Sequence, residues 1–142
     1  MTILCKKSVY APASAKDGFR LIVMRRYPRG YAKARAHAWL PELAPTLPLV
    51  HWYHEHLRAI RKQWEREDSR RCEEEITRFW RSYSRRYLAE MKAQRRLIEF
   101  FATLHRDFGM TFTLLCACTD RRICHRSLLA GLMRAAARAR RA

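Results

Sequence analysis

Hydrophobic residues form two short continuous runs and two longer helical stripes along the chain. The runs "FRLIVM" (residues 19–24) and "FTLLCAC" (residues 112–118) have the length of buried strands, and "TILCKK" (residues 2–7) is a weaker third. Strands that are apolar on both faces are typical of parallel sheets covered by helices. These segments therefore predict a small, mostly parallel sheet.

A long helical region lies between the early strands and the last one. Apolar residues at helical spacing make two stripes, which are Tyr53, Leu57, Ile60 and Trp64, and then Ile76, Phe79, Tyr83, Tyr87, Met91, Ile98, Phe101 and Leu104. The polar segment between the stripes predicts a hairpin corner near Asp68 and Ser69. Three prolines in "LPELAPTLPLV" (residues 40–50) predict a loop or a very short helix.

The last part of the chain predicts a helix that packs on the sheet. Leu128, Leu129, Leu132 and Met133 share one face, and an arginine-rich tail starts at about residue 134. We expect a single α/β domain over residues 1–142. Its small, mostly parallel sheet of three or four strands is covered by helices, with a long helical insertion between the early strands and the last strand.

Charge adds a prediction about partners. The 142 residues contain 30 Lys and Arg against 13 Asp and Glu, a formal net charge of +17. Such a surface attracts polyanions, so nucleic acid or a phosphate-containing ligand is the expected partner. The sequence has neither an apolar run of about 20 residues nor the start of a signal peptide, which predicts a cytoplasmic protein with no membrane partner.

Three of the five cysteines lie in "LLCACTDRRICHRSLLAGLM" (residues 114–133), where a strand gives way to a helix. A loop that feeds a helix N-terminus offers an anion site, and it lowers the pKa of a thiol there. Cys124 with the adjacent His125 is therefore the candidate catalytic pair. Buried packing is the favoured interpretation of Cys116 and Cys118, and it remains an alternative for Cys124.

Two other chemistries fit this segment less well. Cys116 and Arg122 form a Cys-x5-Arg pattern like the oxyanion loop of thiol-dependent phosphatases, but the loop lacks glycine and contains Asp120. Cys116, Cys118, Cys124 and His125 are zinc-ligand types, but structural zinc sites usually use Cys-x2-Cys. His51, His54 and His56 are interpreted as surface histidines. We predict no metal and no cofactor.

Arginines follow both clear strands. Arg25 and Arg29 come after the first, and Arg122 and Arg126 after the last. Ligands of open α/β sheets bind beyond the carboxyl ends of the strands, so these four residues predict an anion-binding crevice if the strands are parallel. The alternative for Arg25 and Arg29 is a structural one, ion pairs that fix their loop.

The C-terminal "RAAARARRA" (residues 134–142) is a second basic region. Arg134, Arg138, Arg140 and Arg141 are candidate nucleic-acid contacts that bind phosphates without reading sequence. The alternative is a solvated helix end, where arginines interact favourably with the helix dipole.

The segment "DGFRLIVMRRYPRG" (residues 17–30) resembles the bacterial family named domain of unknown function 488 (DUF488). Ile3, Cys5, Lys6 and Lys7 match its start, "YSRRYLAEM" (residues 83–91) a helix, and Cys124, His125 and Arg126 the ending of one branch. Met24 stands where the family usually has Asp, and Tyr27 where it usually has Trp. The resemblance implies a cytosolic α/β domain and no particular reaction.

Three functions follow from these observations. The leading hypothesis is a domain with an anion-binding crevice that engages phosphate-containing ligands or nucleic acid. The alternatives are a thiol-dependent enzyme that uses Cys124 with His125 and Arg126, and a basic protein-interaction module.

Overall fold

A four-stranded parallel sheet forms the base of the molecule in a computed structural model that describes residues 2–139. The strands are β1 (Ile3–Leu4), β2 (Phe19–Ile22), β3 (Ala38–Trp39) and β4 (Phe112–Leu115), and their order in the sheet is β1-β4-β2-β3. All three strand pairs are parallel. The predicted α/β class and the parallel sheet are confirmed.

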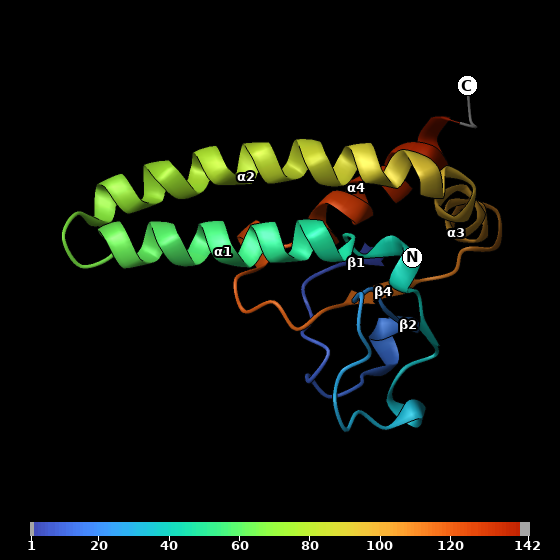
Figure 1. The fold of residues 1–142 in the computed structure, drawn as a ribbon. Helices are drawn as coiled ribbons and strands as arrows, with labels where there is room; N and C mark the ends of the chain where they lie inside the picture. The colour runs from blue at the N-terminus through green and yellow to red at the C-terminus, as the bar shows by residue number, and fades with distance from the viewer. Residues whose placement is uncertain (1, 140–142) are drawn as a thin grey trace.

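Four α-helices complete the fold (Figure 1). They are α1 (Leu47–Trp64), α2 (Ser69–Met91), α3 (Arg95–Phe108) and α4 (His125–Ala139). Helices α1 and α2 form a long hairpin that extends beyond the sheet. Its corner lies where the sequence predicts it, because the Asp68 side chain caps α2 by accepting a hydrogen bond from the Arg71 backbone N–H.

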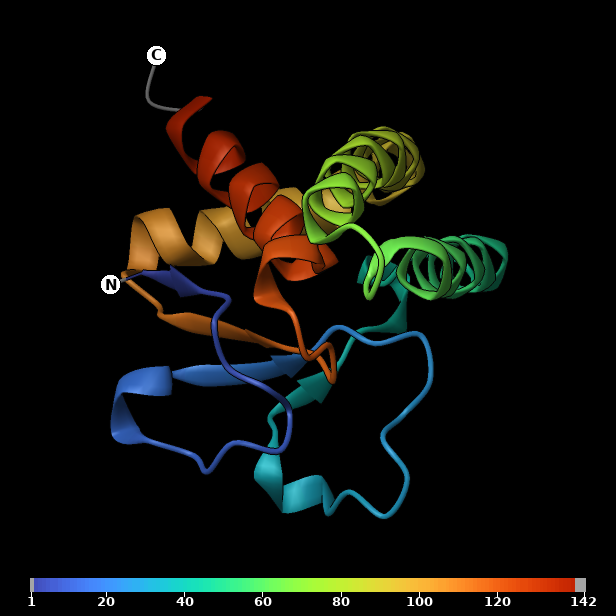
Figure 2. The same cartoon turned by 90° about the vertical axis from the view of Figure 1, so that its left-hand side faces the viewer.

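The helices lie on one side of the sheet, and loops cover the other side (Figure 2). Toward the helices, Leu21 and Leu114 pack in one core cluster with Tyr87 of α2 and Leu129 of α4. The alternate residues Ile22 and Leu115 point to the opposite face, where they pack with Val9 and Tyr31 from the loops. Both faces are thus buried, as continuous apolar strands require, although only one face is covered by helices.

One expectation about the early part of the chain needs correction, and one strand there was not predicted. The proline-rich segment contains the expected short helix, a 3-10 turn at Pro41–Leu43, but α1 already begins at Leu47. Pro48 fits there because the N–H that proline lacks has no partner in the first turn of a helix. The two-residue strand β3 has no periodicity signal, because it is too short to show one.

Among residues 2–139, no helix combines the length and the apolar character that crossing a membrane requires.

Candidate functional site

The carboxyl ends of β2 and β4 meet at one edge of the sheet. Ile22 and Leu115 are register partners in a parallel pair, so the segments after them, which begin at Val23 and Cys116, leave the sheet side by side. This is the edge where ligands of open α/β sheets bind. The loops after β2 and β4 therefore lie at the same edge of the sheet, as the sequence analysis expects for parallel strands.

A cavity of about 470 Å³ opens at this edge, between the two loops and helix α1. Its volume is in the range of small-molecule sites. The apolar and aromatic walls come mainly from Met24, Leu47, Val50, Tyr53, Leu57, Tyr83 and Ile123. Arg25, Arg26 and Arg61 supply the cations, Cys116 and Cys118 the thiols, and His51, His54 and His125 the imidazoles.

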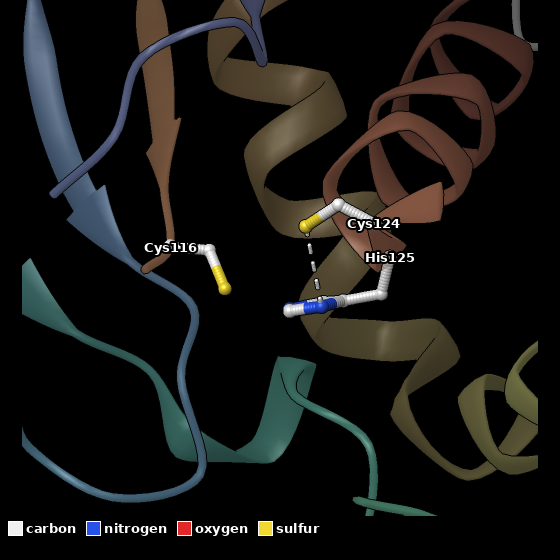
Figure 3. A group of neighbouring side chains, drawn as sticks. All are labelled: Cys116, Cys124 and His125. Carbon is white, nitrogen blue, oxygen red and sulfur yellow. Dashed lines mark hydrogen bonds between the residues drawn. The ribbon is translucent and has the colours of Figure 1, made fainter. Parts of the chain in front are cut away.

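Two thiols and one imidazole converge at this cavity (Figure 3). The ligand atoms of Cys116, Cys124 and His125 all lie within 4.8 Å of one another, and all three residues are buried. The Cys118 sulfur lies 3.6 Å from that of Cys116. Cys116 follows β4 directly, Cys124 lies just before α4, and His125 is the first residue of α4, so the fold joins residues that the chain separates by a loop.

The imidazole of His125 has a fixed orientation. Its Nε2 lies 2.6 Å from the Val23 carbonyl oxygen, which can only accept, so Nε2 carries a hydrogen and donates it. In the neutral ring, Nδ1 then holds the lone pair, and this atom lies 3.9 Å from the Cys124 sulfur. The packing of the Tyr87 ring against the imidazole, with ring centroids 5.5 Å apart, holds the orientation.

Arg126 is the cation nearest to the Cys124 sulfur. Its Nε donates to Cys124 Sγ over 3.1 Å, and its terminal nitrogens donate to the carbonyl oxygens of Lys7 and Cys118. The side chain is fully buried, with 1 % of the residue exposed. Arg126 was predicted to bind an anion, but its guanidinium is already held by these three partners and does not line the cavity.

The three neighbouring thiols differ in pKa. Hydrogen bonds from the Cys116 and Cys118 thiols hold the pKa of Cys124 well below its ordinary value, against burial, which raises it. The Cys118 thiol lowers the pKa of Cys116, but the contact with Cys124 and burial outweigh this and raise it to about 11. Contacts with Cys116 and Cys124, with burial, raise the pKa of Cys118. These contacts therefore favour the thiolate form at Cys124 over that at Cys116 or Cys118.

The other predicted anion-binding arginines lie in different environments. Arg25 lines the cavity, but it donates to the carbonyl oxygens of Ala44 and Pro45 over 2.9 and 3.0 Å, so it also fixes its loop. Arg122 pairs with Asp120 over 3.0 Å and does not line the cavity. Arg29 is exposed and lies outside the cavity lining.

Two of the candidate nucleic-acid residues, Arg134 and Arg138, lie away from this site. Arg134 donates to the Ile3 carbonyl oxygen, and Arg134 and Arg138 line a separate groove beside Arg106. Arg140 and Arg141 lie outside the described residues.

The family model described as "Active DUF488-N3 subclade" matches residues 4–137. The chain belongs to the DUF488 family. Its match spans every strand and helix of the domain in whole or in part. No curated protein and no solved structure gives a significant match to this chain.

The residues that carry the DUF488 resemblance include some that support the site and some, such as Arg25 and His125, that line it. Asp17 and Arg20 form a buried salt bridge of 2.6 Å at the start of β2. Trp39 Nε1 donates to the Met24 carbonyl oxygen over 2.8 Å, and the Tyr27 ring packs on Trp39. Met24 itself, at the position where the family usually has Asp, lines the cavity.

Helix α1 contributes site residues that the sequence analysis did not identify. Tyr53, Leu57 and Arg61 all line the cavity. They are spaced by four residues and therefore share one helix face. Tyr53 also donates its hydroxyl hydrogen to the Ile123 carbonyl oxygen over 2.6 Å, which ties α1 to the second loop. The spacing was visible in the sequence, but it indicated core packing as readily as a cavity wall.

Proposed function

We propose that the cavity binds a small ligand that joins a phosphate group to an apolar or aromatic body. The observation that carries this proposal is the presence of two arginines, Arg26 and Arg61, in the lining of an apolar cavity; the charge of Arg61 also acts on Asp120. Within residues 2–139, the guanidinium groups of Arg26 and Arg61 make no hydrogen bond or salt bridge, and both line the cavity. One guanidinium group can donate two parallel hydrogen bonds to the oxygen atoms of a phosphate.

The charge balance of the cavity supports an anion. Asp120 is the only carboxylate that lines it among the described residues, and Arg122 already neutralises this group. Arg25 adds a further positive charge to the lining. A methionine at position 24 adds no charge, whereas an aspartate there would oppose an anion.

The apolar and aromatic walls of the cavity indicate what the part of the ligand outside the phosphate is like. Tyr53 and Leu57 line the cavity on α1, and Tyr83 lines it on α2. Aromatic and aliphatic side chains stabilise a ligand body by burying its apolar surface. A nucleoside monophosphate has both parts, and one such molecule suits a cavity of about 470 Å³.

The alternative role of Cys124 as a nucleophile has less support. A nucleophile must reach the reacting atom of its substrate. Only 1 % of Cys124 is exposed, and this residue does not line the cavity. The description of the matched subclade contains the word "active" but names no reaction and no residue. The geometry supports ligand binding more directly.

Isothermal titration with adenosine monophosphate tests the proposal. We expect saturable binding to the wild-type protein. Arg61→Gln should weaken it about 10-fold to 100-fold, since a hydrogen bond to a charged group contributes about 1.5–3 kcal/mol. Met24→Asp should also weaken it through like-charge repulsion.

Arg85→Gln is the matched control, because Arg85 is an exposed arginine of α2 outside the cavity lining. It should leave the affinity unchanged. Equal affinities of the wild type and Arg61→Gln, or no binding of adenosine monophosphate and inorganic phosphate at millimolar concentration, would refute the proposal.

A further inference from the structure

A cluster of soft metal ligands lies beside the cavity, and the proposed ligand binding does not use it. Among the described residues, Cys116, Cys124 and His125 are the one group of His, Cys, Asp and Glu side chains whose ligand atoms all lie within 4.8 Å of one another. The two sulfur atoms and the imidazole ring point into one space between the end of β4 and the start of α4 (Figure 3).

We propose that Cys116, Cys118, Cys124 and His125 bind a zinc ion. Zinc in a tetrahedral site lies about 2.3 Å from sulfur and about 2.0–2.1 Å from nitrogen, so its ligand atoms are about 3.5–3.8 Å apart. The distances here are close to these values. Cys116 Sγ and Cys118 Sγ are 3.6 Å apart, and Cys124 Sγ and His125 Nδ1 are 3.9 Å apart.

Three ligands are already gathered, and the fourth is adjacent. The Cys118 sulfur is next to that of Cys116 but lies outside the group of three. It becomes the fourth ligand by moving toward Cys124 and His125. Cys118 belongs to the loop between β4 and α4 and is only half-buried, so it is less constrained than the buried Cys116 and Cys124.

The surroundings of His125 are those of a metal-binding histidine. Such a residue donates its other ring N–H to a carbonyl or carboxylate, which fixes the ring and its tautomer. His125 does this through Nε2 and the Val23 carbonyl oxygen, and its Nδ1 lone pair faces the sulfur atoms. The ring therefore needs no rearrangement to bind a metal.

Arg126 balances the charge of the proposed site. A zinc ion with three thiolates and one neutral imidazole has one net negative charge, which is costly to bury alone. The buried Arg126 guanidinium supplies one positive charge and donates to Cys124 Sγ over 3.1 Å. Hydrogen bonds of this kind orient metal ligands and compensate their charge.

From the sequence we predict no metal, because Cys116 and Cys118 have Cys-x-Cys spacing, whereas structural zinc sites usually have Cys-x2-Cys spacing. The fold makes this spacing less important, because Cys116 and Cys118 do not have to supply the site as an isolated pair. The other two ligands, Cys124 and His125, come from the junction of the loop with α4.

Metal analysis of the purified protein tests the inference. The chain is stripped with a chelator, supplied with zinc, and desalted. We expect one zinc per wild-type chain, and the same value for Cys5→Ser, whose cysteine is not in the cluster. Cys124→Ser should lose the metal.

The absorption spectrum of bound cobalt(II) provides a second readout. On the wild-type protein, this measurement does not depend on whether a variant folds. Bound cobalt should give sulfur-to-cobalt charge-transfer absorption, and Cys118→Ser should reduce its intensity by about one third because one of three thiolates is lost. Wild-type protein with well under one zinc per chain and no such absorption would overturn the inference.

This outcome is separate from that of the proposed ligand binding. The adenosine monophosphate titration depends on Arg61 and is done on both stripped and zinc-loaded protein. If the protein binds no zinc, the comparison of wild type with Arg61→Gln still tests ligand binding. If adenosine monophosphate does not bind, the zinc analysis still tests the metal site.

Discussion

Single residues at the start of β2 show how a buried charge is made stable. Asp17 is buried, with 2 % of the residue exposed, and pairs with Lys7 over 2.8 Å and with Arg20 over 2.6 Å. Burial raises the pKa of Asp17, but hydrogen bonds from Lys7, the Ser14 backbone and Arg20 together outweigh it and leave the pKa below its ordinary value. The carboxylate is the form that the fold stabilises.

Stability should therefore depend on pH through Asp17. A carboxyl group with a lowered pKa contributes stability above its unfolded-state pKa of about 3.9, and this is lost as the pH falls through the folded-state pKa. Asp17→Asn should lower the free energy of unfolding by about 3–5 kcal/mol at pH 7, because it leaves Arg20 buried without its partner charge.

Urea denaturation at pH 7 and at decreasing pH below 4 measures this effect. The difference between the wild type and Asp17→Asn should shrink toward the lowest pH. A difference that is independent of pH would contradict the role of the charge.

Pairs of elements are held together by a few specific contacts. Tyr87 of α2 is fully buried and donates to the Leu43 carbonyl oxygen over 2.7 Å, which joins the hairpin to the segment before α1. Thr46, just before α1, donates to Glu90 near the end of α2. These contacts fix the position of α1, the helix that carries Arg61.

Removing one hydroxyl should loosen this connection. Tyr87→Phe leaves the buried Leu43 carbonyl oxygen without its donor, which costs about 1–3 kcal/mol. The control is Tyr10→Phe, since Tyr10 is 57 % exposed and should change stability by less than about 0.5 kcal/mol. Equal unfolding free energies for the two variants in urea would show that the Tyr87 hydrogen bond contributes nothing.

The sequence predicted the elements whose patterns are long or strongly apolar. The hairpin stripes through Leu57 and Phe79, the runs of β2 and β4, and the corner at Asp68 all follow from local periodicity and capping. Local periodicity did not predict strand β3, because two residues are too few to show a period. It did not predict the start of α1 either, because Pro48 indicated a break in the helix.

The site was predictable only in part for a similar reason. The parallel strands brought Arg25 and Cys116 to one edge, as expected. Whether an arginine faces a cavity or a backbone carbonyl depends on contacts between distant segments, such as Arg126 with Lys7. Local sequence holds no information about those partners.

At the scale of the whole molecule, the net charge of +17 predicts nonspecific binding to nucleic acid. Affinity for a single-stranded oligonucleotide should fall steeply with salt concentration, because phosphate contacts release counterions. A chain that ends at Ala139 lacks Arg140 and Arg141 but keeps Arg134, which bonds to Ile3. Its log–log salt slope should be smaller by about 1.4, at about 0.7 per contact.

Fluorescence anisotropy across a salt series measures both slopes. An unchanged slope would place the contacts outside the last three residues, and no binding at low salt would exclude nucleic acid as a partner.

The cavity at the carboxyl edge of the sheet is the proposed anion site. The most direct test is X-ray diffraction from crystals of the protein that contain tungstate, a phosphate analogue with strong anomalous scattering. We expect the highest anomalous peak inside the cavity, beside the guanidinium group of Arg26 or that of Arg61. A highest peak in the groove of Arg106, Arg134 and Arg138, with none in the cavity, would contradict it.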